Sequence, residues 1–277
     1  MVDDQILVMD SVTKLEAEDA GKVLVAASHG GVYAAYLAAT GRARGVILND
    51  AGGGLQDAGF GGLEWADAFG MPAATVDCMS AKIGDGKDMM VSGYISHTNL
   101  AAAKAGVAVG LGCGAAAARM LAAEMWRGEV PNLPESRFVI SEGVDGPKVL
   151  GCDSASLIRD EDRGQIVVCA SHGGLLANNP GYILKAPVLG VVLNDAGIGK
   201  EGAGVARIHA AASMGIAAGA VLAASARIGD ARSTWETGII SVLNELALAC
   251  GCTVGMSTKE FVGALIHAQK TKRMTVS

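Results

Sequence analysis

The strongest constraint on this chain is an internal repeat, because the sequence carries most of one structural unit twice. Residues 5–31 align with residues 148–174 at a constant offset of 143, and 12 of the 27 pairs are identical. Two extra residues near Pro180 change the offset to 145, and residues 45–59 then match residues 190–204 at 10 of 15 positions. A repeat of this extent indicates a tandem duplication, so we expect both copies to fold alike.

Each copy alternates between strand and helix patterns. Short apolar runs rich in β-branched residues predict strands at 6–9, 22–27, 45–48 and 73–77 in the first copy and at 149–152, 165–170, 190–193 and 218–222 in the second. Helices are expected after Gly31 and Gly174, and over about 88–105 and 233–250. Such alternation predicts an α/β fold: two small three-layer domains with mainly parallel sheets, packed as a pseudo-dimer.

The expected boundaries follow from the repeat and from a change of composition between the copies. Residues 1–124 form the first repeat and residues 148–277 the second. The connector, residues 125–147, holds three of the six prolines and several charges. We therefore expect it to be an exposed linker.

Composition excludes several classes of protein. The chain is 51% hydrophobic and 18% charged, so it is not intrinsically disordered. Its net charge is −6 without a dense basic run, which argues against nucleic acid as a partner. Six cysteines without paired spacing are typical of reduced cytosolic thiols.

Targeting signals are also missing from the sequence pattern. Residues 1–5 are acidic and lack the plan of a signal peptide. Residues 208–226 contain no Lys, Arg, Asp or Glu, but their Ala and Gly content favours a buried helix and strand over a membrane span. A cytoplasmic location is expected, and the Ala- and Gly-rich helices are compatible with a homo-oligomer.

Four polar motifs recur where predicted strands end. They are Asp-Ser at 10–11 and 153–154, Ser-His-Gly-Gly at 28–31 and 171–174, Asn-Asp-Ala-Gly at 49–52 and 194–197, and Ser-Ala-Lys/Arg-Ile-Gly-Asp at 80–85 and 225–230. Ligands of open α/β sheets bind outside the carboxyl ends of the strands. We therefore expect the functional site at this edge, as one composite site or as two unequal sites.

The candidate catalytic groups are a serine, a histidine and an aspartate in each copy. They are Ser28, His29 and Asp50, and Ser171, His172 and Asp195. Serine can act as a nucleophile or donor, histidine as an acid or base near neutral pH, and aspartate as the group that orients it. The alternatives are a serine that caps a helix, a histidine in a polar niche and an aspartate in an Asx-turn.

The candidate substrate-binding residues come from the same motifs. They are Gly30, Gly31, Asn49, Ser80, Lys82 and Asp85, and Gly173, Gly174, Asn194, Ser225, Arg227 and Asp230. Glycines permit a tight turn and close approach of a ligand, and a helix N-terminus attracts an anion. Both copies have a cationic residue at the same position of this motif, Lys82 and Arg227, which favours a carboxylate or phosphate on the ligand. The alternative is that these cations form salt bridges with Asp85 and Asp230.

The segment 26–30, followed by a helix and the strand 46–50, resembles the nucleophile elbow of the α/β-hydrolases. The resemblance covers some 25 residues and implies a serine nucleophile at Ser28. Ala26 replaces the first glycine of the elbow. The first copy contains Ser28, Asp85 and His97 in the order of a Ser-Asp-His triad, but Val242 replaces the histidine in the second copy. An α/β-hydrolase is one undivided domain, so its triad is not carried over to this chain.

These features favour an enzyme acting on a small anionic metabolite, first a hydrolase of an amide, lactam or ester bond. An acid–base isomerase or lyase without a covalent intermediate is the alternative, and a non-catalytic metabolite-binding protein is the third. No cofactor is expected, because the loops match neither a Walker A nor a Rossmann fingerprint. No metal is expected either: the set His29, Asp50 and Asp85 lacks supporting spacing, and Cys250 and Cys252 with His267 fall short of four zinc ligands.

Overall fold

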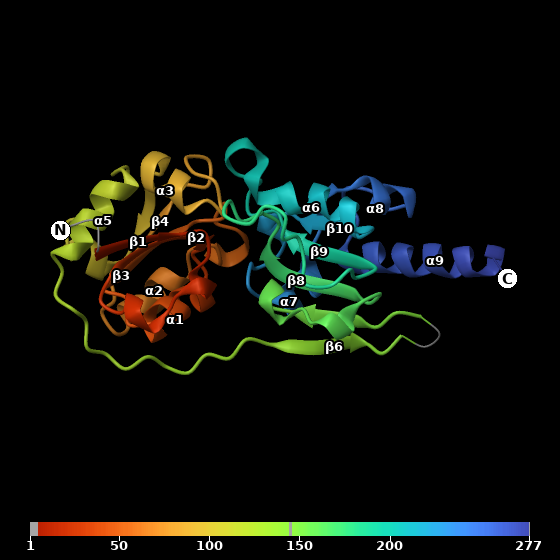
Figure 1. Cartoon of the computed structure of the whole chain (residues 1–277), viewed down its shortest axis with the longest axis horizontal. Helices are drawn as coiled ribbons and strands as arrows, with labels where there is room; N and C mark the ends of the chain where they lie inside the picture. The colour runs from red at the N-terminus through yellow and green to blue at the C-terminus, as the bar shows by residue number, and fades with distance from the viewer. Residues whose placement is uncertain (1–4, 144–145, 277) are drawn as a thin grey trace.

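The computed structural model describes residues 5–143 and 146–276, the side chains of 272–276 excepted, and contains two sheet-containing halves (Figure 1). In the first half four strands run parallel and a fifth is antiparallel at the edge. They are β1 (Ile6–Met9), β2 (Val23–His29), β3 (Gly45–Asn49), β4 (Ala73–Val76) and the antiparallel β5 (Ile95–Thr98), in that spatial order. The predicted mainly parallel sheet is confirmed here.

The second half repeats this strand order and adds one strand. Its strands are the antiparallel β6 (Arg137–Ser141), the parallel β7 (Val149–Cys152), β8 (Ile166–His172), β9 (Gly190–Asn194) and β10 (Ala217–Val221), and the antiparallel β11 (Ile240–Leu243). The parallel core of this sheet is likewise confirmed. Both halves are therefore α/β structures.

Helices cover both faces of each sheet. The helices are α1 (Val32–Thr40), α2 (Gly62–Asp67), α3 (Gly86–Ser92), α4 (Leu100–Lys104) and α5 (Cys113–Leu121) in the first half, and α6 (Ala206–Ala210), α7 (Ala231–Thr237), α8 (Glu245–Ala249) and α9 (Thr258–Val276) in the second. Successive strand residues face opposite sides, so Leu24 packs in a core with α1 and α2, while Val25 packs in a core with α3 and α5. Figure 1 shows these two helix pairs on opposite sides of the first sheet.

The predicted helices at 88–105 and 233–250 are wrong in one respect, because each is interrupted by a strand. α3, β5 and α4 occupy the first range, and α7, β11 and α8 the second. Gly93 and Gly238 end the first helix of each range in extended conformation. Asn99 then caps α4 by accepting a hydrogen bond from the backbone of Ala102, so the chain restarts a helix only after the strand.

The helix predicted after Gly174 is also wrong. The first half forms α1 at this point, but residues 175–189 of the second half contain neither helix nor strand. Pro180, Gly181 and Pro187 lie within this segment, and proline removes a backbone donor that a helix needs. We call residues 175–189 the irregular segment.

The connector is extended and passes along the first half before it joins the second sheet (Figure 1). Trp126 anchors it, because this buried side chain donates a hydrogen bond from Nε1 to the backbone oxygen of Ala43, at 2.7 Å. Its later part forms β6, which pairs with β7. Positions 144 and 145 of the connector lie outside the described residues.

The uncharged run 208–226 forms α6, β10 and short 3-10 turns. Over residues 5–143 and 146–276, no helix combines the length and the apolar character needed to cross a membrane. The expectation about the N-terminal segment concerns residues 1–5, of which residues 1–4 lie outside the described part of the chain.

Candidate functional site

The two halves meet at the carboxyl ends of their central strands. Two glycines face each other across this contact: a Cβ on Gly52 would lie 2.7 Å from the Cα of Gly197, and a Cβ on Gly197 2.8 Å from the Cα of Gly52. Both glycines have positive φ, +73° and +71°. A small cluster that includes the buried Ile83 and Ile228 surrounds them. The Asn-Asp-Ala-Gly motifs therefore build the contact between the halves.

A cavity of about 680 Å³ lies beside this contact and takes its walls from both halves. The residues important for its chemistry are Ser28, His29 and Tyr33 from the first half, Glu135 from the connector, and Ser171, His172 and Arg207 from the second half. A volume of this size suits a small molecule. Both Ser-His pairs identified in the sequence thus reach one shared cavity.

Each histidine of the cavity is held by the glycine two residues further on. The backbone N–H of Gly31 donates to Nδ1 of His29, and that of Gly174 donates to Nδ1 of His172, both at 3.1 Å. A neutral ring whose Nδ1 accepts carries its proton on Nε2. Throughout the described part of the chain, neither Nε2 has a protein partner, so each ring that lines the cavity carries an N–H free to bind a ligand.

Both rings are neutral at physiological pH. Burial lowers the pKa of His29 to about 4. Burial lowers the pKa of His172 well below its ordinary value, and the positive charge of Arg207 lowers it further. The two imidazoles are therefore arranged as hydrogen-bond donors rather than as bases.

The glycine pairs of the Ser-His-Gly-Gly motifs allow other protein atoms, rather than a ligand, to approach the backbone closely. A Cβ on Gly31 would lie 2.7 Å from Nδ1 of His29, and one on Gly30 would lie 2.7 Å from the backbone oxygen of Gly59. In the second half, a Cβ on Gly174 would lie 2.9 Å from Nδ1 of His172. None of the four glycines, Gly30, Gly31, Gly173 and Gly174, lines the cavity.

The two serines line the cavity and also hold the preceding loops. The N–H of Val12 donates to Oγ of Ser28 at 3.0 Å, and the N–H of Ala155 donates to Oγ of Ser171 at 2.9 Å. Among the described residues, neither serine hydrogen-bonds to the histidine beside it. The arrangement of a serine activated by a neighbouring base is therefore not present.

Asp50 and Asp195 face the turns between the halves rather than the cavity. Oδ1 of Asp50 accepts hydrogen bonds from the backbones of Gly52 and Cys78, each at 3.0 Å. Oδ1 of Asp195 accepts in the same way from Gly197, at 3.0 Å, and Oδ2 accepts from Ser241, at 2.8 Å. These contacts match the Asx-turn alternative considered above.

The remaining motif side chains also hold loops. The side-chain oxygens of Asn49 and Asn194 each accept a hydrogen bond from the backbone N–H two residues further on. Their amide groups donate to the backbone of the loops that contain Lys82 and Arg227, respectively. Asp85 and Asp230 cap α3 and α7, and Ser80 and Ser225 each bond two backbone groups nearby. None of these residues lines the cavity between the serines.

Lys82 and Arg227 bridge the two halves. Nζ of Lys82 lies 2.6 Å from a carboxylate oxygen of Glu201, in the other half. Arg227 pairs with Asp230 and donates to Oε1 of Gln56 at 3.2 Å, again across the contact. Arg227 and Asp230 also line a smaller cavity of about 390 Å³ that shares His29, Tyr33 and Glu135 with the larger one.

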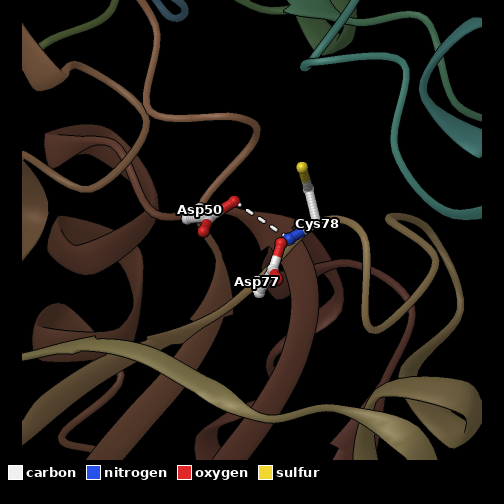
Figure 2. A group of neighbouring side chains, drawn as sticks. All are labelled: Asp50, Asp77 and Cys78. Carbon is white, nitrogen blue, oxygen red and sulfur yellow. Dashed lines mark hydrogen bonds between the residues drawn. The ribbon is translucent and has the colours of Figure 1, made fainter. Parts of the chain in front are cut away.

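One group of potential metal ligands occurs in the described residues, and it differs from the set considered in the sequence. Ligand atoms of Asp50, Asp77 and Cys78 lie within 4.8 Å of one another. Figure 2 shows these three side chains, with the hydrogen bond from the backbone N–H of Cys78 to Asp50. Burial, and then the two carboxylates, raise the pKa of Cys78 to about 12, so the thiol is protonated and a poor ligand at neutral pH.

Two residues that the sequence reasoning missed, Arg207 and Glu135, line the cavity. The side chain of Arg207 is 6% exposed, and within the described ranges its guanidinium makes no hydrogen bond or ion pair. Burial raises the pKa of Glu135, while hydrogen bonds with Tyr33 and Ser154 oppose the rise. The sequence did contain one signal for Arg207: the first copy has Gly62 at the corresponding position, so the two copies differ there by a large charged side chain. Glu135 lies in the connector, which has no counterpart.

Comparisons with known proteins identify no relative of this chain. No protein-family model matches this chain, and neither a curated protein nor a solved structure gives a significant match.

Proposed function

We propose that the chain is an enzyme that transfers a proton next to a carbonyl group of a small molecule bound in the cavity between the halves. One observation carries the proposal: two neutral imidazoles whose Nε2–H groups have no partner among the described residues line a single cavity. A neutral imidazole can donate to a carbonyl oxygen while that oxygen gains negative charge, without first losing its own proton. The reaction class is therefore an isomerase or a lyase.

Glu135 is the candidate base. It lines the cavity, and its raised pKa makes its carboxylate a stronger acceptor of a carbon-bound proton than an exposed glutamate would be. The proton moves from the carbon to Glu135, and the carbonyl oxygen becomes an enolate oxygen held by an imidazole N–H. Return of the proton at a neighbouring carbon completes an isomerisation, whereas departure of a leaving group completes an elimination.

Tyr33 supports this assignment. Burial, and then the negative charge of Glu135, raise the pKa of Tyr33 to about 12, so its hydroxyl stays protonated beside the base. It can therefore donate to Glu135 when the carboxylate is charged. This contact opposes the effect of burial on Glu135 and positions the carboxylate.

We infer that the two halves arose by duplication and pack as a pseudo-dimer, with the site between them. Three observations support this: the shared strand order, the reciprocal contact of Gly52 with Gly197, and the equal Nδ1 hydrogen bonds of His29 and His172. A shared cavity favours one composite site over two separate ones.

A hydrolase with a covalent step is the second candidate, and one observation favours it. The N–H of Val12 donates to Oγ of Ser28, and such a donor would stabilise the alkoxide of a nucleophile. Treating the protein with a small fluorophosphonate and measuring its intact mass tests this reading. An adduct on Ser28 or Ser171 supports the hydrolase, and its absence favours proton transfer or simple binding.

The experiment that tests proton transfer is hydrogen exchange in D₂O. Small keto and hydroxy acids are incubated with the protein, and loss of their C–H signals is followed by proton NMR. We expect exchange with the native protein, a decrease of at least about 100-fold with Glu135→Gln, and no change with Glu129→Gln, an exposed glutamate of the same connector. Exchange that survives Glu135→Gln contradicts the role of this base.

A further inference from the structure

The starting observation is the state of Arg207 in the cavity wall. Its side chain is nearly fully buried, and Nε is inaccessible and has no hydrogen-bond partner. No carboxylate among the described residues forms an ion pair with it. The guanidinium is thus a buried cation whose counter-charge the described protein does not supply.

A buried cation without a partner is unfavourable in a folded protein. Moving a charge out of water costs several kcal/mol unless an opposite charge or hydrogen bonds compensate. Arginine cannot escape this cost by losing its proton, because its pKa lies above 12 in water. The cavity beside Arg207 is the place from which an anion could reach it.

The space for this side chain exists only in the second half. The backbones of Arg207 and Gly62 occupy equivalent places, because their N–H groups donate to Gly173 and Gly30, respectively. A Cβ on Gly62 would lie 2.8 Å from the Cβ of Ala35 in α1. The second half has the irregular segment in place of this helix, so a large side chain fits there.

We propose that Arg207 binds a carboxylate group of the substrate and thereby fixes the orientation of the substrate in the cavity. This inference rests on the proposal that the cavity is the substrate site, but it does not depend on the reaction. The planar guanidinium matches two carboxylate oxygens in a bidentate geometry. Glu135 and Asp153 also line the cavity, so a ligand with one negative charge suits it better than a phosphate dianion.

The orientation follows from the neighbours of Arg207. The guanidinium is close enough to His172 to lower the pKa of that imidazole, and its backbone bonds to the next residue, Gly173. His29 lines the smaller cavity together with Tyr33 and Glu135, whereas His172 and Arg207 do not line it. The carboxylate therefore binds on the His172 side, and the reacting carbon faces His29 and Glu135.

The test compares thermal unfolding of the native protein with that of Arg207→Leu and Arg207→Gln. Each protein is heated in sodium chloride and in acetate, pyruvate, lactate or phosphate at equal ionic strength. We expect at least one carboxylate to raise the Tm of the native protein by about 2 °C or more, and none to raise that of either variant. Arg163→Gln, which alters an exposed arginine of the same half, should behave like the native protein.

A second readout separates ligand binding from a structural role. Without carboxylate, Arg207→Leu should unfold at the same temperature as the native protein or a few degrees higher, because it no longer buries an unpaired charge. A lower Tm of both variants in chloride would show that Arg207 stabilises the fold, and it would overturn the proposal. Equal carboxylate shifts in all proteins, no shift in any, or a larger shift with phosphate would overturn it as well.

This result is independent of the reaction. Carboxylate shifts that require Arg207, together with no proton exchange in D₂O, would retain the anion site and reject the proposed enzyme. Proton exchange that requires Glu135, together with no carboxylate shift that depends on Arg207, would retain the enzyme and reject the anion site.

Discussion

The two Ser-His-Gly-Gly motifs share one local geometry, but the segments that follow them differ. In both halves the second glycine donates to Nδ1 of the histidine at 3.1 Å. After the first motif the chain forms α1, whereas after the second it forms the irregular segment. This segment also binds the first half, because the N–H of Asn178 donates to Asp10 at 2.7 Å and that of Ala177 to the backbone oxygen of Gly84 at 2.9 Å.

The comparison shows how one motif can acquire two roles. The motif itself sets the tautomer and the position of each imidazole, through a hydrogen bond that spans only two residues. What surrounds the imidazole depends on the segment that follows the motif. In the first half, α1 packs against Gly62 and leaves no room for a side chain there. In the second half, the irregular segment leaves room for the buried Arg207 at the equivalent position. We therefore expect corresponding substitutions in the two halves to have unequal effects.

The largest expected effect comes from replacing the histidines with asparagine. Asparagine retains an acceptor near the Nδ1 position and removes the Nε2–H donor. His29→Asn should lower kcat about 100- to 1000-fold, the usual loss for a donor that stabilises developing negative charge. His172→Asn should mainly raise KM, because His172 lies beside the carboxylate site.

Steady-state kinetics on any substrate found by the exchange screen checks this pair. His267→Asn, which alters an exposed histidine of α9, is the control and should not change either constant. Equal losses of kcat in the two variants would remove the distinction between the halves.

The second-largest effect is expected from substitutions at the glycine contact between the halves. Gly52→Ala and Gly197→Ala each combine a positive φ with a clash across the contact, and we expect each to lower the free energy of unfolding by about 2–4 kcal/mol. Gly164→Ala is the matched control, because Gly164 has the same φ of +73° as Gly52 but no neighbouring atom within 4 Å of the added Cβ. Urea unfolding measures the three values. A loss no greater than that of the control would show that the halves do not press together at this point.

The stability of the protein should decrease in acid because of the cavity histidines. In the unfolded chain a histidine takes up a proton near pH 6.5, whereas folded His29 does so only near pH 4. Between these values the unfolded state binds more protons, so stability is complete above pH 6.5 and decreases as the pH falls, by up to about 3 kcal/mol for this histidine. His172 should act in the same direction.

Urea unfolding at several pH values between 4 and 7 measures this dependence. His29→Asn should have a shallower pH dependence than the native protein over this range. An unchanged slope would mean that the imidazole of His29 is accessible to protons in the folded state.

The smallest effect concerns the two cationic bridges between the halves. Lys82 faces the carboxylate of Glu201, whereas Arg227 faces the neutral amide of Gln56. Gln56→Glu would make the second bridge ionic, and we expect it to add up to about 1 kcal/mol of stability, which high salt should remove. The comparison of urea midpoints at low and high salt measures the gain. A decrease in stability would show that the two bridges are not equivalent.

Much of the fold could be predicted because its signals are local or repeated. The parallel strands follow from apolar runs such as 22–27 and 165–170, and the repeat showed that the two halves would have similar sheets. The misplaced helices at 88–105 and 233–250 show the limit of that reasoning. A short edge strand such as β5 has too few residues to stand out from the helices on both sides.

For the candidate site, the sequence determined which side chains gather at the carboxyl ends of the strands and how each histidine ring is held. These features depend on residues two positions apart, as in the contact of Gly31 with His29. Only the three-dimensional structure shows that the turn held by Asp50 meets the other half, that Glu135 reaches the cavity from the connector, and that Arg207 is buried without a counter-charge. Burial and charge pairing depend on segments more than a hundred residues apart, and a local pattern carries no information about which of them will meet.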